Sequence, residues 1–339
     1  INDYRAQNPL TMGNFTMSYM TLGTFFGKDG DNFTSRIFDQ MLQNRTVISR
    51  RLGELNPEVT VNPNAPYQPG FGPNQTDVLL YSFLAAYRGV DAESQSLDMF
   101  PDIPIPNWRV QFDGLKNIPF FKDRLKNIVI THGYQSTLSM SGYQSNNAYN
   151  QVGAGYWDDN PFGYTELDPN NNFVSRFFLN SVTLQESFNP LVKLDLTFNN
   201  DIQATVELKS SRNISLNFPN NQVTENNTFE VAVGAGYRVA EFPFPFLING
   251  KRIANQLNIR LDIGWRDNAT VIRKIEEEVQ QVTAGQQALN IKFFAEYAFS
   301  KSISARFFFD HVGNNPFISN QFPTATSNGG LSIRFTLQP

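Results

Sequence analysis

Apolar and polar residues alternate along most of the second half of the chain. The alternation runs VKLDLTF over residues 192–198, FEVAVGAGY over residues 229–237 and LNIRLDIGW over residues 257–265. Successive side chains of a strand point to opposite faces, so a period of two predicts strands with one apolar face. The pattern recurs in residues 202–208, 214–218, 289–297, 303–309 and 331–337. The chain is therefore predicted to be all-β, with a tight turn at Asn199, Asn200 and Asp201.

The first hundred residues follow a different period. Apolar residues recur at helical spacing in residues 35–55, and Gly53 and Pro57 lie where such a helix would stop. Residues 77–88 predict a second helix that Gly89 would end. Residues 59–74 are rich in proline and predict a loop, whereas residues 15–19 predict a strand. The two helices fit the core of a small soluble domain as well as an insertion beside a sheet.

These patterns divide the chain into three expected regions. A strand segment occupies residues 1–30, a helical and loop insertion residues 31–103, and strands with their loops residues 104–339. Within the third region, residues 106–112 and 127–143 alternate, residues 153–172 predict a long acidic loop, and a further strand is expected to open at Phe173. The sequence IRKIEEEVQQV, within residues 269–283, fits either a helix or two charged strand ends.

Three features of the strands fit a membrane β-barrel, and the charges and aromatic strand ends also favour it over a soluble sandwich. Several strands reach about ten residues, the length that crosses a bilayer at a tilt. Their polar faces carry charges of both signs, such as Asp195 and Arg260, which a water-filled lumen accommodates, and aromatic residues mark strand ends. A solvated face of a soluble sheet explains the charges equally well. We predict a transmembrane antiparallel β-barrel segment with one lipid-facing register, defined by Val192, Val231, Ile259 and Ile291.

Composition narrows the classes of partner and site. The 339 residues carry a net charge of −4 without a long run of one sign, so nucleic acid is not expected as a partner. Aromatic residues make up 14%, mostly 31 Phe and 12 Tyr, which suits strands and membrane-interface belts. The absence of cysteine excludes disulfides and thiolate metal sites. The chain contains no run of about 18 apolar residues, so the sequence predicts no transmembrane helix. It starts at Ile1 without a signal peptide, which predicts a processed chain or a fragment.

Several stretches resemble one family. They are FDQMLQNRTVISRRLG (residues 38–53), DVLLYSFLAAYRGVD (77–91), FPDIPIPNWRVQFDGL (100–115), IVITHGYQSTLSMSG (128–142), RDNATVIRKIEEEVQQVTAG (266–285) and the closing GLSIRFTL. Together they resemble the C-terminal region of the SprA/Sov family, the outer-membrane translocon of the type IX secretion system of Bacteroidota. PNWRV and THGYQSTLS are the most specific phrases. The resemblance covers nearly the whole chain in the family's order and implies the C-terminal portion of a much longer protein.

The resemblance implies part of a gated protein-conducting channel in the bacterial outer membrane. Such a channel exports folded cargo from the periplasm to the cell surface through one very wide barrel. The implied partners are the remainder of the same barrel chain, a lipid-facing β-barrel protein at a lateral opening, a periplasmic plug protein, secreted cargo proteins and membrane lipid. The last strand, residues 331–337, is then expected to pair with a strand upstream of this chain.

Other interpretations stay open on the sequence alone. One is a different outer-membrane barrel, such as a nutrient transporter or a fatty-acid channel. Another is a soluble β-rich carbohydrate-binding or hydrolase module. Independently of the resemblance, the helical period of residues 35–55 predicts a helix off the membrane wall, in or at the mouth of the pore.

The sequence offers no catalytic, cofactor or metal site, and enzymatic activity is not expected. His132 and His311 lack neighbouring ligands, and His132 falls in phase with Ile128 and Ile130, as a wall residue would. Asp29-Gly30-Asp31 is an incomplete calcium loop. The acidic loop fits either a calcium site or a solvated surface, and its carboxylates are Asp158, Asp159, Glu166 and Asp168. Two strand glycines, Gly234 and Gly236, suit a bend or close packing.

Overall fold

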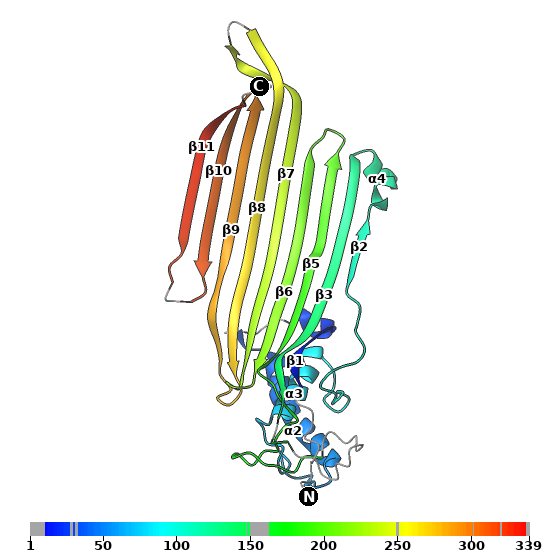
Figure 1. Ribbon diagram of the computed structural model, residues 1–339. Helices are drawn as coiled ribbons and strands as arrows, with labels where there is room; N and C mark the ends of the chain where they lie inside the picture. The colour runs from blue at the N-terminus through cyan, green and yellow to red at the C-terminus, as the bar shows by residue number, and fades with distance from the viewer. Residues whose placement is uncertain are drawn as a thin grey trace, which may run out of the picture.

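A tall, twisted sheet dominates the fold, with a small helical region against its lower end (Figure 1). The structure is a computed structural model that describes residues 11–27, 30, 33–146, 148–149, 163–248, 251–300, 302–318 and 321–336. The lower end of the sheet is the end at which β3 (Leu125–Ser145) finishes and β5 (Ser181–Phe198) begins. We call residues 19–100 the helical region.

The sheet has 11 antiparallel strands in the order β1-β3-β5-β6-β7-β8-β9-β10-β11, with β2 and β4 pairing with β3 beside this path. From β5 onward each strand pairs with the next along the chain, so this part is an up-and-down meander. The remaining strands are β1 (Met12–Ser18), β2 (Trp108–Phe112), β4 (Phe177–Phe178), β6 (Gln203–Asn217), β7 (Gln222–Ile248), β8 (Lys251–Lys274), β9 (Gln280–Ala298), β10 (Ile303–Pro316) and β11 (Thr324–Phe335).

The alternation of the sequence determines the two faces of the sheet. Val231 lies opposite Leu208 of β6 and Trp265 of β8, and Ile263 lies opposite Ile291 of β9. Paired residues share a face, so the apolar positions of neighbouring strands form continuous rows. We call this side the apolar face. The opposite side is the charged face, and it carries Glu230, Asp262 and Lys292.

Two helices form most of the helical region. α2 (Arg36–Leu55) begins after Ser35, whose Oγ accepts a hydrogen bond from the Phe38 N–H, as an N-cap does. α3 (Thr76–Arg88) begins after Gln75, whose side chain accepts from the Val78 N–H, and it ends at Gly89, which has φ 74°. Both helices confirm the sequence prediction. The shorter helices are α1 (Leu22–Phe25), the 3-10 helix η2 (Gly114–Asn117) and α4 (Pro119–Lys122).

The helical region packs on the lower part of the apolar face. α3 is almost wholly buried, and its side chains share one core with α2 and with Leu138, Leu184, Ile214 and Val223 of four strands. These four sheet residues are at most 1% exposed. The core therefore lies at the lower end of the molecule, between helices and sheet. Among the described residues, no helix combines the length and the apolarity needed to cross a membrane.

Three expectations are corrected or decided by the structure. The strand expected from Phe173 does not form there, because Phe173 makes only an isolated bridge with Leu167 and its ring packs on Phe71; β4 and β5 follow later. The stretch 269–283 is not a helix, since β8 ends at Lys274 and β9 starts at Gln280. The predicted turn at residues 199–201 forms, with Asp201 at φ 64°.

The sheet does not close into a barrel within the described residues. β1 and β11 end the path of paired strands and do not pair with each other. The mostly-β, antiparallel prediction is therefore confirmed at that level, and the sheet is open.

Candidate functional site

Above the helical region, the described residues leave most of the apolar face uncovered from β5 to β11. We call this uncovered part the apolar band. On β7 it runs from Phe229 to Val239, and Val233 in its middle is 43% exposed. Exposure continues across the sheet to Ile263 on β8 at 38% and Ile333 on β11 at 58%. Ten residue steps on β7 span about 33 Å along the strand, or about 25 Å of height at a tilt of about 40°.

The apolar band ends on one rung of the sheet. The rung that joins Val231, Trp265 and Leu289 is apolar, whereas the next one down places Asp267 between Phe229 and Gln287. The Gln287 side chain donates a hydrogen bond to the Asp267 carboxylate over 3.2 Å. On β6, β8 and β9 the apolar positions end on this rung, and Phe229 extends the band by one rung on β7.

Aromatic side chains gather at both ends of the apolar band. At the lower end, Phe229 and Trp265 meet edge to face with ring centroids 6.2 Å apart. At the upper end, Phe244 lies 5.1 Å from Tyr297 and 4.9 Å from Phe299. Aromatic girdles of this kind flank the apolar zone of membrane barrels.

The charged face carries both signs in close pairs. Lys193 contacts Asp195 at 3.1 Å, and Arg260 contacts Asp262 at 2.7 Å. In both pairs the partners are two residues apart on one strand, so they share a face. Gly234 provides space for the second pair, because a Cβ there would lie 2.8 Å from Asp262 Oδ1. The charges largely neutralise one another, so this face has no strong field of one sign.

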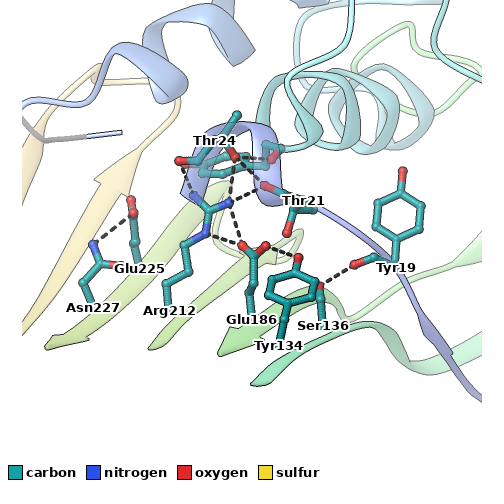
Figure 2. Close-up of polar contacts among 10 residues, drawn as sticks. Tyr19, Thr21, Thr24, Tyr134, Ser136, Glu186, Arg212, Glu225 and Asn227 are labelled. Atoms are coloured by element: carbon teal, nitrogen blue, oxygen red, sulfur yellow. Dashed lines mark hydrogen bonds and ion pairs between the residues drawn. The ribbon is translucent and has the colours of Figure 1, made fainter. Parts of the chain in front are cut away.

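A buried ion pair joins the sheet to the helical region (Figure 2). Arg212 of β6 donates from Nε to Glu186 of β5 over 2.9 Å, and the two side chains are 5% and 1% exposed. The other guanidinium nitrogens donate to the Thr21 and Thr24 carbonyls, each over 3.0 Å. The Tyr134 hydroxyl donates to the second oxygen of Glu186. The pair thus holds the segment around α1 to the sheet.

A second buried pair repeats this arrangement two strands away. Arg273 of β8 donates to Glu225 of β7 over 3.0 Å, and Arg273 is fully buried. It also donates to the Phe33 carbonyl over 2.7 Å and to the Gln280 side chain. Gln280 in turn accepts from the Ser35 N–H over 2.8 Å, just before α2. Both ends of the 21–35 segment are therefore attached to the sheet by arginine.

A buried carboxylate lies inside the helical region. Asp77, in the first turn of α3, accepts hydrogen bonds from Gln75 over 3.1 Å and from the Tyr164 hydroxyl over 3.0 Å. Burial raises the pKa of Asp77, although these hydrogen bonds act in the opposite direction. Burial also raises the pKa of Tyr164 well above its ordinary value. Asp77 therefore joins α3 to the segment that carries Tyr164.

No known protein family model matches this chain, and no curated protein matches it.

The residues considered for metal binding that the structure describes do not form a cluster. His132 donates a hydrogen bond from Nδ1 to the Leu191 carbonyl over 2.6 Å, and it shares the apolar face with Ile130. His311 contacts Ser327 on β11. In the described part of the chain no cluster of three or more His, Cys, Asp or Glu could hold a metal ion. Of the proposed calcium loops, Asp29 and Asp31 lie outside the described residues, as do Asp158 and Asp159.

Sequence reasoning missed the two buried arginine–glutamate pairs. Arg212 falls in phase with Ile214 and Leu216, so a strand pattern already placed a charge on the apolar side. A charged residue in phase with buried apolar residues needs a partner, and Glu186 on the adjacent strand supplies it. The signal in the sequence was a charged residue at a position that the alternation assigns to the apolar face. Identifying its partner also required the register between β5 and β6.

Proposed function

We propose that this chain is a wall segment of an outer-membrane β-barrel and that the barrel conducts secreted proteins. The apolar band carries the first part of the proposal. A soluble protein rarely leaves a broad apolar surface facing water, and here the band is uncovered over seven adjacent strands, from β5 to β11. Lipid covers such a surface without further protein, and its height of about 25 Å suits the apolar zone of a bilayer.

The charged face supports an aqueous lumen on the other side of the wall. Several of its charges form short pairs, such as Lys193 with Asp195 and Arg260 with Asp262. Phe294, an aromatic exception on this face, lies 4.3 Å beneath the Arg306 guanidinium. A wall that mixes charges of both signs at short range attracts a passing protein weakly, because little net field of one sign extends beyond the surface. Passage through such a lumen is passive, and the residues of this face take no chemical part in it.

The protein cargo and the partner proteins rest on the resemblance to the SprA/Sov family. The open edges of the sheet agree with a wall completed by other strands, since unpaired backbone groups cost several kcal/mol each in hydrocarbon. The proposed partners are the remainder of the barrel, a β-barrel protein at a lateral opening, a periplasmic plug protein and cargo.

Adjacent residues on β7 test the membrane wall directly. The chain has no native cysteine, so Val233→Cys and Ala232→Cys each introduce a single labelling site. A nitroxide at residue 233 should be reached by oxygen dissolved in lipid, whereas a nitroxide at residue 232 should be reached by a water-soluble quencher. Equal accessibility at the two positions in membranes contradicts the wall.

Photo-crosslinking tests the nature of the cargo. A photoreactive amino acid at Glu230, on the charged face, should form adducts with secreted proteins in cells that are exporting them. The same group at Val231, on the apolar face, is the matched control and should label lipid or a membrane partner. Absence of protein adducts at residue 230 together with lipid exposure at residue 233 favours a transporter of small solutes.

A further inference from the structure

A groove of about 930 Å³ lies where the helical region meets the lower end of the apolar band. One wall comes from the segment around α1 and the start of α2, and the other comes from β6, β7 and β8. The groove residues nearest the band are Phe26, Phe229 and Trp265. Phe26 is 61% exposed although it lines the groove. The groove therefore opens directly onto the apolar band.

Two oppositely charged residues line opposite walls of the groove. Arg36, the first residue of α2, lines the helical wall, and Asp267 lines the sheet wall. Within the described part of the chain, neither side chain forms an ion pair, and Asp267 has only the hydrogen bond from Gln287. The other two charged residues of the groove, Arg212 and Glu225, are already paired with Glu186 and Arg273. Among the described residues, each wall thus offers one charge without an ion pair.

From this arrangement we propose that the groove binds the head group of a phospholipid that carries both a phosphate and a primary ammonium. The inference rests on the proposed membrane wall, because the acyl chains would lie along the apolar band above Trp265. Arg36 binds the phosphate, and Asp267 accepts hydrogen bonds from the ammonium. Both contacts are charge-assisted and are therefore stronger than neutral hydrogen bonds.

The two charges also select among head groups. A phosphatidylglycerol head offers a phosphate to Arg36 but no cation to Asp267. A phosphatidylcholine head carries a cation without an N–H, so it cannot donate a hydrogen bond to the carboxylate. Phosphatidylethanolamine offers both a phosphate to Arg36 and an N–H donor to Asp267. The expected order of affinity places phosphatidylethanolamine first.

Trp265 provides the probe, because it lines the groove and lies at the end of the band. Trp108→Phe and Trp157→Phe leave it as the only tryptophan of the chain. The full chain is reconstituted in phosphatidylcholine that contains a small mole fraction of a lipid with brominated acyl chains, which quench indole fluorescence on contact. Brominated phosphatidylethanolamine should reach half-maximal quenching at about a tenfold lower mole fraction than brominated phosphatidylcholine or phosphatidylglycerol.

Asp267→Asn should remove this preference, so that the three brominated lipids reach half-maximal quenching at similar mole fractions. The matched control is Asp310→Asn, which makes the same change on the charged face and should keep the preference. Arg36→Gln should weaken all three lipids alike, because each has a phosphate.

The outcomes separate the groove from the wall. Quenching in pure brominated phosphatidylcholine reports that Trp265 contacts lipid at all, and its absence overturns the membrane wall together with the groove site. If Trp265 is fully quenched in pure brominated phosphatidylcholine but shows no preference among head groups, the lipid site alone is overturned. A preference that Asp267→Asn leaves unchanged has the same consequence. Loss of the preference in Asp310→Asn also overturns it.

Discussion

Arg212 and Glu186 form an ion pair at 2.9 Å although both are nearly inaccessible to solvent. The pair lies where β5 and β6 pass beneath α1, and the arginine also binds the carbonyls of Thr21 and Thr24. Charges this deeply buried are stable only when every donor and acceptor is satisfied. Here the guanidinium serves two purposes, since it neutralises a glutamate and satisfies backbone carbonyls at the short helix α1.

Removing one partner of this pair should destabilise the chain strongly. Arg212→Ala leaves Glu186 buried and unpaired, which costs about 3–5 kcal/mol. The expected result is a lower urea midpoint in detergent and earlier proteolytic cleavage in residues 19–35. Arg260→Ala is the control: it breaks the exposed pair with Asp262 and should change stability by less than about 1 kcal/mol. Similar losses in the two variants would contradict the anchoring role of Arg212.

The ionisation of Asp77 should destabilise the helical region as pH rises from acid to neutral. An uncharged variant at this position should lack this loss. Burial raises its pKa above the ordinary value of 3.8, so the folded state prefers the protonated form. This contribution is fully present below the unfolded-state pKa and is lost as pH rises through the folded pKa. Asp77→Asn should therefore gain in thermal midpoint over the wild type as pH rises from 3 to 8.

A second acidic residue provides the control for this pH dependence. Asp39 occupies the first turn of α2, as Asp77 occupies that of α3, but Asp39 is exposed. Asp39→Asn should follow the wild-type curve of melting temperature against pH closely. If Asp77→Asn follows that curve too, burial does not perturb Asp77 in the folded chain.

Adjacent positions on β9 should tolerate arginine very differently. Ile291 lies in the apolar band and Asn290 lies on the charged face. An arginine near the middle of a bilayer costs about 2–4 kcal/mol on a lipid-facing surface and little in a lumen. Ile291→Arg should therefore lower the stability of the chain folded into vesicles by that amount, measured by denaturant titration. Asn290→Arg should stay within about 1 kcal/mol of wild type, and the reverse order would exchange the two faces.

The open edge at β11 predicts that residues 1–339 alone do not form a stable pore. β11 pairs with β10 on one side only among the described residues. The unpaired backbone groups along its other side need a strand, because hydrocarbon offers them no hydrogen bonds. Expressed alone, the chain should show no discrete conductance in planar bilayers. A heat-modifiable monomer that conducts ions would instead indicate a small closed barrel and favour a nutrient transporter.

Much of the sheet could be predicted from sequence because one face is apolar along each strand. The alternation around Val231 and Ile263 was strong enough to assign both the strand and the face, and their pairing confirms that they share it. The helices were predicted from sequence too, α2 by the helical spacing of its apolar residues and α3 with Gly89 at its end. The failure at Phe173 has a physical cause: its ring packs in the core of the helical region beside Phe71, so the residue is apolar without belonging to a strand.

The relationship between the helices and the sheet could not be predicted. The pattern of Ile214 and Leu216 is identical to that of Val206 and Leu208 on the same strand, yet the first two are buried under helices and the other two lie in the band. Only the three-dimensional arrangement distinguishes a surface covered by protein from one left bare. Pairing across the sheet was also needed to connect Arg212 with Glu186 and Arg273 with Glu225.

The two buried arginines bind the 21–35 segment largely through its main chain. Arg212 binds two carbonyls of that segment, and Arg273 binds the carbonyl of Phe33. Every amino acid has a carbonyl, so most side chains of the segment can change during evolution without loss of these contacts. Selection should therefore retain the arginine and glutamate of the strands, while the segment they hold diverges in sequence and keeps its position.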